Sequence, residues 1–400
     1  MTDSKGQPTK PERTGTFTHS TRIGSILGIA IYLDASVFII FALVVWILGG
    51  NIFPSWHPDW SAGSSWLTGL GAGILFFISL LLHEMAHSVT ARRFGINVPR
   101  ITLFLFGGVS EMEEEPATPK TELLIAIVGP AMSLFLGMLF STVANLMAPP
   151  GFDEMLMKNQ SAALASLSPL TTLLFWLGPV NFILGVFNLV PGFPLDGGRV
   201  LRAIVWWLTG SLDRATRAAT GAGRLFGWLL MILGALQVLS GTVVQGLWLV
   251  LIGWFLSSAA SSSYGQMVMR RTLRGCRVAD VMRTHFEIVD AATTVDRFID
   301  DFLLKSNQRL WPVTSAGRLA GFASLETIQD IEPERRAGLR VHEVMRTDLD
   351  ELTLPANADA MKAMERLSLA STPMAVVRGD EVLGLIAQED VVKWLALHRR

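Results

Sequence analysis

The chain has 400 residues, of which 50% are hydrophobic and only 17% are charged, and its mean hydropathy is +0.42. Water-soluble proteins average about 25% charged residues, so this composition excludes a purely soluble protein. A net charge of −1 leaves no basic excess to neutralise nucleic-acid phosphates, and Cys276, as the only cysteine, excludes an intrachain disulfide.

The chain begins with a polar segment, residues 1–22, which has no apolar region after its positive charges. We expect a disordered cytoplasmic tail there and not a cleaved signal peptide. Six apolar runs follow, and each is near or above the length of about 20 residues that crosses a bilayer. They lie at 28–49, 66–91, 121–147, 170–190 (continuing as a bent segment to 209), 222–240 and 243–263. Residues 23–264 are therefore predicted to form a six-span α-helical membrane domain.

The loops between these runs differ in their content of Lys and Arg. Loop 92–120 and segment 197–224 carry several of these residues, whereas loop 50–65 carries none and loop 148–169 carries only Lys158. Positive charge marks the cytoplasmic side of a membrane protein. We therefore predict a multi-pass protein of the cell membrane with both termini in the cytoplasm.

The second apolar run contains the sequence LLHEMAHSVT, with ionisable side chains at His83, Glu84 and His87. Ionisable groups inside a membrane segment are costly and mark functional sites. The i, i+4 spacing places both imidazoles on one helix face, where they can bind one zinc ion. Glu84 then lies where a general base can take a proton from a water that the metal activates.

A zinc ion held by two imidazoles needs a third protein ligand. The acidic candidates near membrane depth are Asp34, Glu122 and Asp196. The first two lie near membrane surfaces, where a solvated carboxylate is ordinary. Asp196 lies in FNLVPGFPLDGGRV, where Pro191 and Pro194 break the helix. Broken backbone at membrane depth is tolerated only where protein buries it or it lines a wet cavity. The predicted orientation also places Asp196 at a depth similar to that of HEMAH, toward the cytoplasmic leaflet.

Between the second and third runs, TLFLFGGVSEMEEEPATPK shows apolar alternation around Gly107 and Gly108. This pattern predicts a short hairpin at the membrane surface. The tail of the chain contains an internal repeat: VADVMRTHFEIVD from Val278 aligns with VHEVMRTDLDELTL from Val341, 63 residues further on. Each copy continues with a helical segment, two strands and a closing helix. After a linker at 265–277 we predict two α/β domains, 278–333 and 341–398, that pack together because each alone exposes an apolar face.

The motifs HEMAH and NLVPGFPLDGG together resemble those of the site-2 protease family of intramembrane zinc metalloproteases, in particular the sporulation-protease-type branch with a pair of CBS domains. The resemblance implies one zinc ion per chain, held by His83, His87 and Asp196, with Glu84 as the general base. Asn188 matches a family asparagine that helps to hold the substrate, although an asparagine here also fits an interhelical hydrogen bond. The resemblance further implies a strand beside the active site, whose edge can pair with an extended substrate.

The tail resembles a tandem pair of CBS domains, which often bind adenine nucleotides. Their usual pattern has Gly, a Ser or Thr three residues later, and an Asp six residues after the Gly. The first copy has Gly321 and Ser324 but no aspartate, and the second has Gly384 and Asp390 but no hydroxyl. Nucleotide binding at Ser324 and Asp390 and a structural role, such as pairing two chains into a homodimer, both stay open.

These features predict a polytopic α-helical membrane protein with six transmembrane segments, followed by an α/β tandem CBS-domain pair. The predicted activity is cleavage of a transmembrane segment of a membrane-protein substrate near its cytoplasmic end, regulated by the CBS pair. A CBS-regulated transporter or channel would explain the spans and the tail but not the paired motifs. A catalytically inactive scaffold is a third alternative, against which the intact Glu84 argues.

Overall fold

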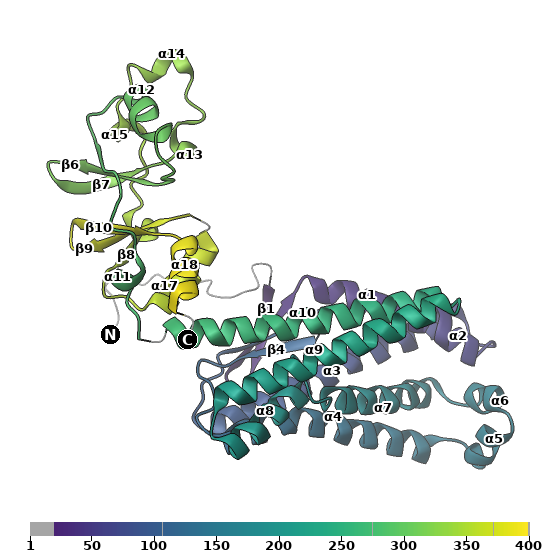
Figure 1. The fold of residues 1–400 in the computed structure, drawn as a ribbon. Helices are drawn as coiled ribbons and strands as arrows, with labels where there is room; N and C mark the ends of the chain where they lie inside the picture. The colour runs from purple at the N-terminus through teal and green to yellow at the C-terminus, as the bar shows by residue number, and fades with distance from the viewer. Residues whose placement is uncertain (1–19, 106, 274, 371, 399–400) are drawn as a thin grey trace. The chain divides into compact units, whose positions relative to one another are not determined.

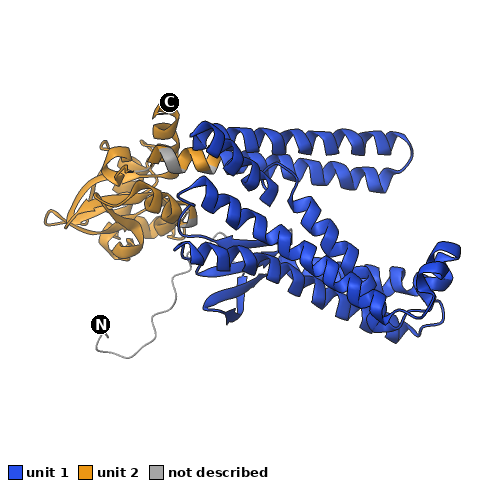
Figure 2. Ribbon diagram, turned by 90° about the horizontal axis from the view of Figure 1, so that it is seen from below, with its two compact units in different colours: residues 1–264 blue, residues 265–400 orange. Residues whose placement is uncertain are grey.

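A computed structural model describes residues 20–105, 107–273, 275–370 and 372–398. The chain forms two compact units, 1–264 and 265–400, and their boundary falls inside helix α10 (Val243–Leu273; Figure 2). The predicted tail lies outside the described residues as far as residue 19, and a strand begins at Ser20. The segment predicted as a linker, 265–277, is helical as far as Leu273.

The first unit combines long helices with one small sheet (Figure 1). Before α10, its helical elements are α1 (Ser36–Ile47), η1 (Leu48–Ile52), α2 (Phe53–Trp56), α3 (Ala62–Arg93), α4 (Pro119–Met147), α5 (Phe152–Lys158), α6 (Gln160–Ala165), α7 (Pro169–Asn188), α8 (Asp196–Thr209) and α9 (Leu212–Leu239). Its strands are β1 (Ser20–Ile26), β2 (Ile29–Asp34), β3 (Arg100–Phe104) and β4 (Gly107–Glu111).

Six helical segments among the described residues are long and apolar enough to cross a membrane. They are Ser36–Trp56, Ala62–Arg93, Pro119–Met147, Pro169–Asn188, Leu212–Leu239 and Val243–Met269. The prediction of six membrane-spanning segments is thereby confirmed. The last two, α9 and α10, form an antiparallel hairpin joined by a short turn (Figure 1).

The first span begins later than the sequence predicted. Residues 29–34, inside the predicted run 28–49, form strand β2, so α1 begins only at Ser36. β2 lies inside a four-stranded sheet of order β1-β2-β3-β4. Ile29 and Ile31 are buried in a core that includes residues of α3. Their apolar character is therefore used for packing a strand and not for contact with lipid.

The hairpin predicted between the second and third spans is confirmed. β3 and β4 pair antiparallel, with Arg100 opposite Glu111 and Phe104 opposite Gly107. β3 also pairs in parallel with β2, so the two hairpins form one sheet. β4 is the outer strand of this sheet and has β3 as its neighbour on one side only.

The helices at the centre of the unit have clear start and stop signals. α3, α4 and α7 each begin at a hydroxyl side chain (Ser61, Thr118 and Ser168) that accepts a hydrogen bond from the backbone N–H three residues later. α7 ends at Asn188, shortly before two prolines that cannot continue a helix, and α8 begins at Asp196 after this turn. α4 packs against α3, α7 and α8.

The second unit contains the repeated α/β domains, and the predicted fold class is confirmed. Its helical elements after α10 are α11 (Val278–Val281), α12 (Val295–Phe298), η2 (Ile299–Leu303), α13 (Leu325–Ile328), α14 (Pro333–Arg336), α15 (Val341–Val344), α16 (Leu349–Leu352), α17 (Ala360–Ala370) and α18 (Gln388–His398). The strands are β5 (Val289–Asp290), β6 (Trp311–Ser315), β7 (Arg318–Ala323), β8 (Thr353–Pro355), β9 (Met374–Arg378) and β10 (Glu381–Ile386). They form two sheets of matching topology, β5-β6-β7 and β8-β9-β10.

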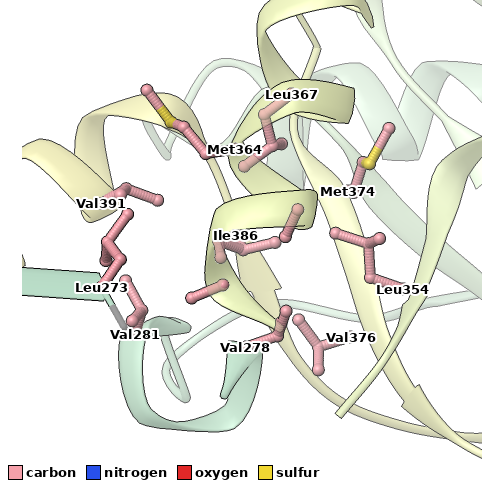
Figure 3. Close-up of a cluster of buried hydrophobic side chains, with 12 residues drawn as sticks. Leu273, Val278, Val281, Leu354, Met364, Leu367, Met374, Val376, Ile386 and Val391 are labelled. Atoms are coloured by element: carbon pink, nitrogen blue, oxygen red, sulfur yellow. The ribbon is translucent and has the colours of Figure 1, made fainter. Parts of the chain in front are cut away.

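The two copies of the repeat exchange their first segments. α11, which opens the first copy, packs in the core of the second copy with Val376 and Ile386 (Figure 3). α15, which opens the second copy, packs in the core of the first with Phe298 and Val313. Each core therefore contains side chains from both copies.

Backbone hydrogen bonds follow the same exchange. Arg283 and Leu385 share two bonds, of 2.7 and 3.0 Å, and Phe322 and Arg346 share two of 2.8 Å. These bonds cross between the ranges 278–333 and 341–398, so the two copies are joined by main-chain pairing as well as by shared cores.

Candidate metal centre

Three side chains from two helices converge in the first unit. α3 contributes His83 and His87, one turn apart, and Asp196 comes from the first residue of α8, 113 residues after His83. The Nε2 atom of each histidine lies 3.1 Å from Oδ2 of Asp196, and the two Nε2 atoms are 3.2 Å apart. In the described part of the chain, the donor atoms of this group all lie within 4.8 Å of one another.

The spacing of these three donor atoms fits a zinc ion. Neighbouring corners of a tetrahedral site with bonds of about 2.1 Å are about 3.4 Å apart. His87 donates its Nδ1–H to the carbonyl oxygen of Ile125 at 2.6 Å. A carbonyl only accepts hydrogen bonds, so in the neutral imidazole of His87 it is Nε2 that carries the lone pair that a metal needs.

His83 and Asp196 also present donor atoms to the same point. His83 Nδ1 lies 2.8 Å from the hydroxyl of Ser133, so its Nε2 also faces the cluster. Asp196 presents Oδ2 to both Nε2 atoms, and a carboxylate oxygen is an ordinary anionic ligand of zinc. With both imidazoles neutral, as metal binding requires, the group would offer two nitrogens and one anionic oxygen to a zinc ion.

Helix α4 passes directly beside the imidazoles. A Cβ atom at Gly129 would lie 2.1 Å from Nε2 of His87 and 2.8 Å from Nε2 of His83, so only glycine leaves room for the two rings. Ile125, Gly129 and Ser133 are spaced four residues apart and lie on one face of α4. Ile125 and Ser133 on this face are the hydrogen-bond partners of the two Nδ1 atoms, and Gly129 leaves the space that the imidazole rings occupy.

Glu84 lies between the histidines in sequence and faces strand β4. Its carboxylate accepts a hydrogen bond from the Ser110 hydroxyl at 2.8 Å, and Ser110 accepts one from Ser88 at 3.0 Å. A Cβ atom at Gly108 would lie 2.4 Å from Cγ of Glu84, so the strand approaches this side chain closely. The residue is 9% exposed. The contact with β4 thus fixes the position of the carboxylate beside the histidine pair.

A buried ion pair connects α8 to α4. Arg202 pairs with Glu122, which is fully buried, and its guanidinium carbon lies 5.4 Å from the centre of the Phe193 ring. Phe193 belongs to the turn that precedes Asp196. Arg202 therefore holds both the turn and the helix that present Asp196 to the histidines.

The remaining candidates in the first unit lie outside the metal-ligand group. Glu122 is engaged by Arg202, and Asp34 accepts a hydrogen bond from the backbone N–H of Ser36 at 2.9 Å. Asn188 is half-buried at the end of α7 and donates to the carbonyl of Leu184 in its own helix at 3.0 Å.

Both candidates for nucleotide binding already have partners in the second unit. Ser324 precedes α13, and its backbone N–H donates to the Thr327 hydroxyl at 3.1 Å. Asp390 is 6% exposed, and its carboxylate accepts hydrogen bonds from Arg283 and from the backbone N–H of Ala387, both at 2.9 Å. A ribose hydroxyl would compete with Arg283 for this carboxylate.

Several residues around the centre were missed by the sequence analysis. Ser133 carried a weak signal, because it is a polar residue inside an apolar run. The Ile125 carbonyl and the Ser110 hydroxyl carried none, since a single sequence does not show which strand or helix packs beside α3.

The fold is that of a multi-pass membrane protein, and comparisons with known proteins identify it as a metalloprotease. The profile of peptidase family M50 matches residues 71–233. The "Putative zinc metalloprotease Rip3" of Mycobacterium tuberculosis is 32% identical over 388 residues, which cover 94% of this chain and 93% of the relative. The chain therefore belongs to peptidase family M50, the site-2 protease family, and is a zinc metalloendopeptidase.

Two solved structures are similar to parts of the chain. The site-2 protease of Methanocaldococcus jannaschii is 29% identical, covers 61% of this chain and 95% of its own length, and gives a TM-score of 0.42. The CBS domain of a bacterial CNNM/CorC family Mg²⁺ transporter, solved in complex with ATP, is 18% identical, covers 33% of this chain and 97% of its own length, and gives a TM-score of 0.29.

Proposed function

We propose that this intramembrane protease holds one zinc ion with His83, His87 and Asp196 and uses Glu84 as its general base. The observation that carries the proposal is the convergence of three donor atoms, 3.1–3.2 Å apart, beside a buried carboxylate. A zinc ion held there supplies a Lewis acid that polarises a peptide carbonyl and activates a water. Glu84 takes the proton of the attacking water and delivers it to the leaving amine.

The substrate is proposed to be a transmembrane segment of a membrane protein, cut near its cytoplasmic end. A helix hides its peptide bonds, so the segment must unwind before cleavage. β4 supports this step, because it is the outer strand of its sheet and runs beside Glu84 at Gly108. An extended substrate that adds to this edge is held by main-chain hydrogen bonds within reach of the base. Asn188 is proposed as a further substrate-positioning residue, at the end of the helix that precedes the Asp196 turn.

The test is co-expression with candidate single-pass membrane regulators, comparing the wild type with Glu84→Gln. Glutamine has nearly the same size but cannot accept a proton, so cleavage should fall at least about 100-fold. Zinc content should remain that of the wild type, because Glu84 is not a proposed ligand. Near wild-type cleavage by Glu84→Gln would show that another group acts as the base.

The second unit is proposed to regulate the protease and to carry none of its chemistry. Within the described residues of that unit, no group of His, Cys or acidic side chains has ligand spacing. An adenine nucleotide whose ribose binds Asp390 must first displace the Arg283 guanidinium. The Asp390–Arg283 pair therefore supports regulation through a change of conformation. The same module is proposed to pair two chains.

A further inference from the structure

The turn between β1 and β2 holds a leucine in a strained conformation. Leu27 and Gly28 both have positive φ angles, of 52° and 74°. Two-residue hairpin turns of this kind favour Asn, Asp or Gly, because a larger side chain clashes with its own backbone when φ is positive. The Leu27 side chain is nevertheless 71% exposed. Packing within the described chain therefore does not offset the strain.

The turn is tied to the C-terminal end of the membrane-spanning helix α3. Arg92, in the last turn of that membrane-spanning helix, donates hydrogen bonds to the carbonyls of Leu27 at 2.7 Å and Gly28 at 3.0 Å. The same guanidinium donates to the Val98 carbonyl at 2.7 Å. The turn is consequently held at the C-terminal end of α3, where two arginines follow the apolar run. On β1 beside it, Ile26 is 45% exposed.

A cavity of about 270 Å³ opens at this place, lined by Leu27, Ile29, Val89, Arg92 and Arg93. Three of these side chains are aliphatic and two are cationic. Arg92 is occupied by backbone carbonyls, whereas Arg93 is exposed and makes no hydrogen bond or ion pair with the described residues. An aliphatic wall beside a free guanidinium matches an acyl chain beside a phosphate.

We propose that this cavity is a phospholipid site, in which Leu27 contacts acyl chains and Arg93 contacts the phosphate of an anionic headgroup. The lipid contact offsets the strain at Leu27 and removes its exposed surface from water. β2 continues from the turn into the sheet, whose outer strand lies against Glu84. A lipid bound at the turn therefore sets the height of the whole sheet in the membrane.

The depth of the turn can be measured in the full-length protein. Cys276, the only cysteine, is replaced by serine, and a nitroxide is attached at Leu27→Cys in vesicles of phosphatidylcholine and phosphatidylglycerol. Leu304→Cys is the matched control, because Leu304 is 73% exposed and lies in the second unit. We expect the label at position 27 to collide several-fold more with oxygen, relative to a water-soluble nickel complex, than the label at position 304. Equal accessibility at the two positions would overturn the proposal.

The lipid retained by the purified protein tests the two side chains separately. Leu27→Gly and Leu27→Asn both suit a positive φ, so each should fold as the wild type does, while less phospholipid co-purifies. Arg93→Gln should lower the enrichment of phosphatidylglycerol over phosphatidylcholine several-fold, and Arg93→Lys should retain it. Wild-type amounts of co-purified phospholipid in Leu27→Gly would exclude the acyl-chain contact. An unchanged lipid profile in Arg93→Gln would exclude the headgroup contact.

Discussion

His87 donates its Nδ1 hydrogen to the backbone carbonyl of Ile125 at 2.6 Å, and this one contact sets the chemistry of the opposite ring nitrogen. The carbonyl cannot donate, so in the neutral ring Nε2 holds the lone pair, and this atom faces His83 and Asp196. A side-chain partner could change its protonation state, but a helix carbonyl does not. The main chain of α4 thus fixes the tautomer that metal binding requires.

Gly129→Ala should reduce zinc binding. The new methyl group would lie 2.1 Å from Nε2 of His87, so one or both imidazoles must move. We expect the metal affinity or the activity to fall at least about 10- to 100-fold. Metal analysis of the purified protein measures this directly. The matched control is Gly71→Ala in α3, where a Cβ meets no atom within 4 Å. Full zinc occupancy in Gly129→Ala would contradict the assignment of this centre.

Ser110→Ala should slow catalysis and leave the metal in place. The change removes the hydrogen bond that orients the Glu84 carboxylate, at 2.8 Å, without touching a proposed ligand. Loss of such a supporting partner typically costs about 10- to 100-fold. Single-turnover cleavage and zinc content are the two measurements. Ser110→Thr keeps the hydroxyl and should retain more activity than the alanine variant. Equal rates for wild type and Ser110→Ala would show that β4 does not position the base.

Glu122→Gln should destabilise the membrane unit. Glu122 is fully buried and pairs with Arg202, so neutralising it leaves a buried guanidinium without its counter-charge. Breaking a buried pair costs about 3–5 kcal/mol. The unfolding temperature in detergent should fall, and zinc should be lost more readily because Arg202 also holds the Asp196 turn. The double variant Glu122→Met with Arg202→Met should recover part of the stability. A wild-type unfolding temperature in Glu122→Gln would refute a stabilising role for the pair.

ATP or AMP should bind the second unit weakly, because Arg283 occupies the Asp390 carboxylate. A ligand that binds the folded state raises its unfolding temperature by mass action. We therefore expect little shift for the wild type and a larger one for Arg283→Ala, which frees the carboxylate. Thermal titration of the full chain provides the measurement. Micromolar binding to the wild type that disappears in Asp390→Ala would instead establish a nucleotide site.

Both termini should lie in the cytoplasm. Loop 50–65 has no Lys or Arg, and the predicted inner loops carry several, which sets the orientation of all six spans. Reporter fusions at Ser61 and at the C-terminus should therefore report opposite sides of the membrane. The same side for both fusions would overturn the proposed orientation.

Several features of the fold and of the candidate site could be predicted from the sequence alone. The number of membrane-spanning segments, the repeat in the tail and the HEMAH motif depend on local composition and spacing. These features need only the length of a bilayer and the pitch of a helix to be interpreted. The start of the first span, by contrast, was predicted too early, because composition alone does not separate a membrane helix from a buried strand. An apolar run such as 28–34 suits either lipid or a buried strand, and only its pairing partners decide between them.

Only the tertiary structure shows which side chains and backbone groups surround the candidate metal ligands. Asp196 lies 113 residues after His83, and the sequence indicated only that the two share a similar depth. That their donor atoms lie 3.1 Å apart, that Gly129 makes room for them, and that β4 contacts Glu84 are results of helix and sheet packing. The exchange of α11 and α15 between the repeats likewise has no local signal. Contacts between distant segments depend on how whole surfaces fit together, and a single sequence does not encode that fit in any short pattern.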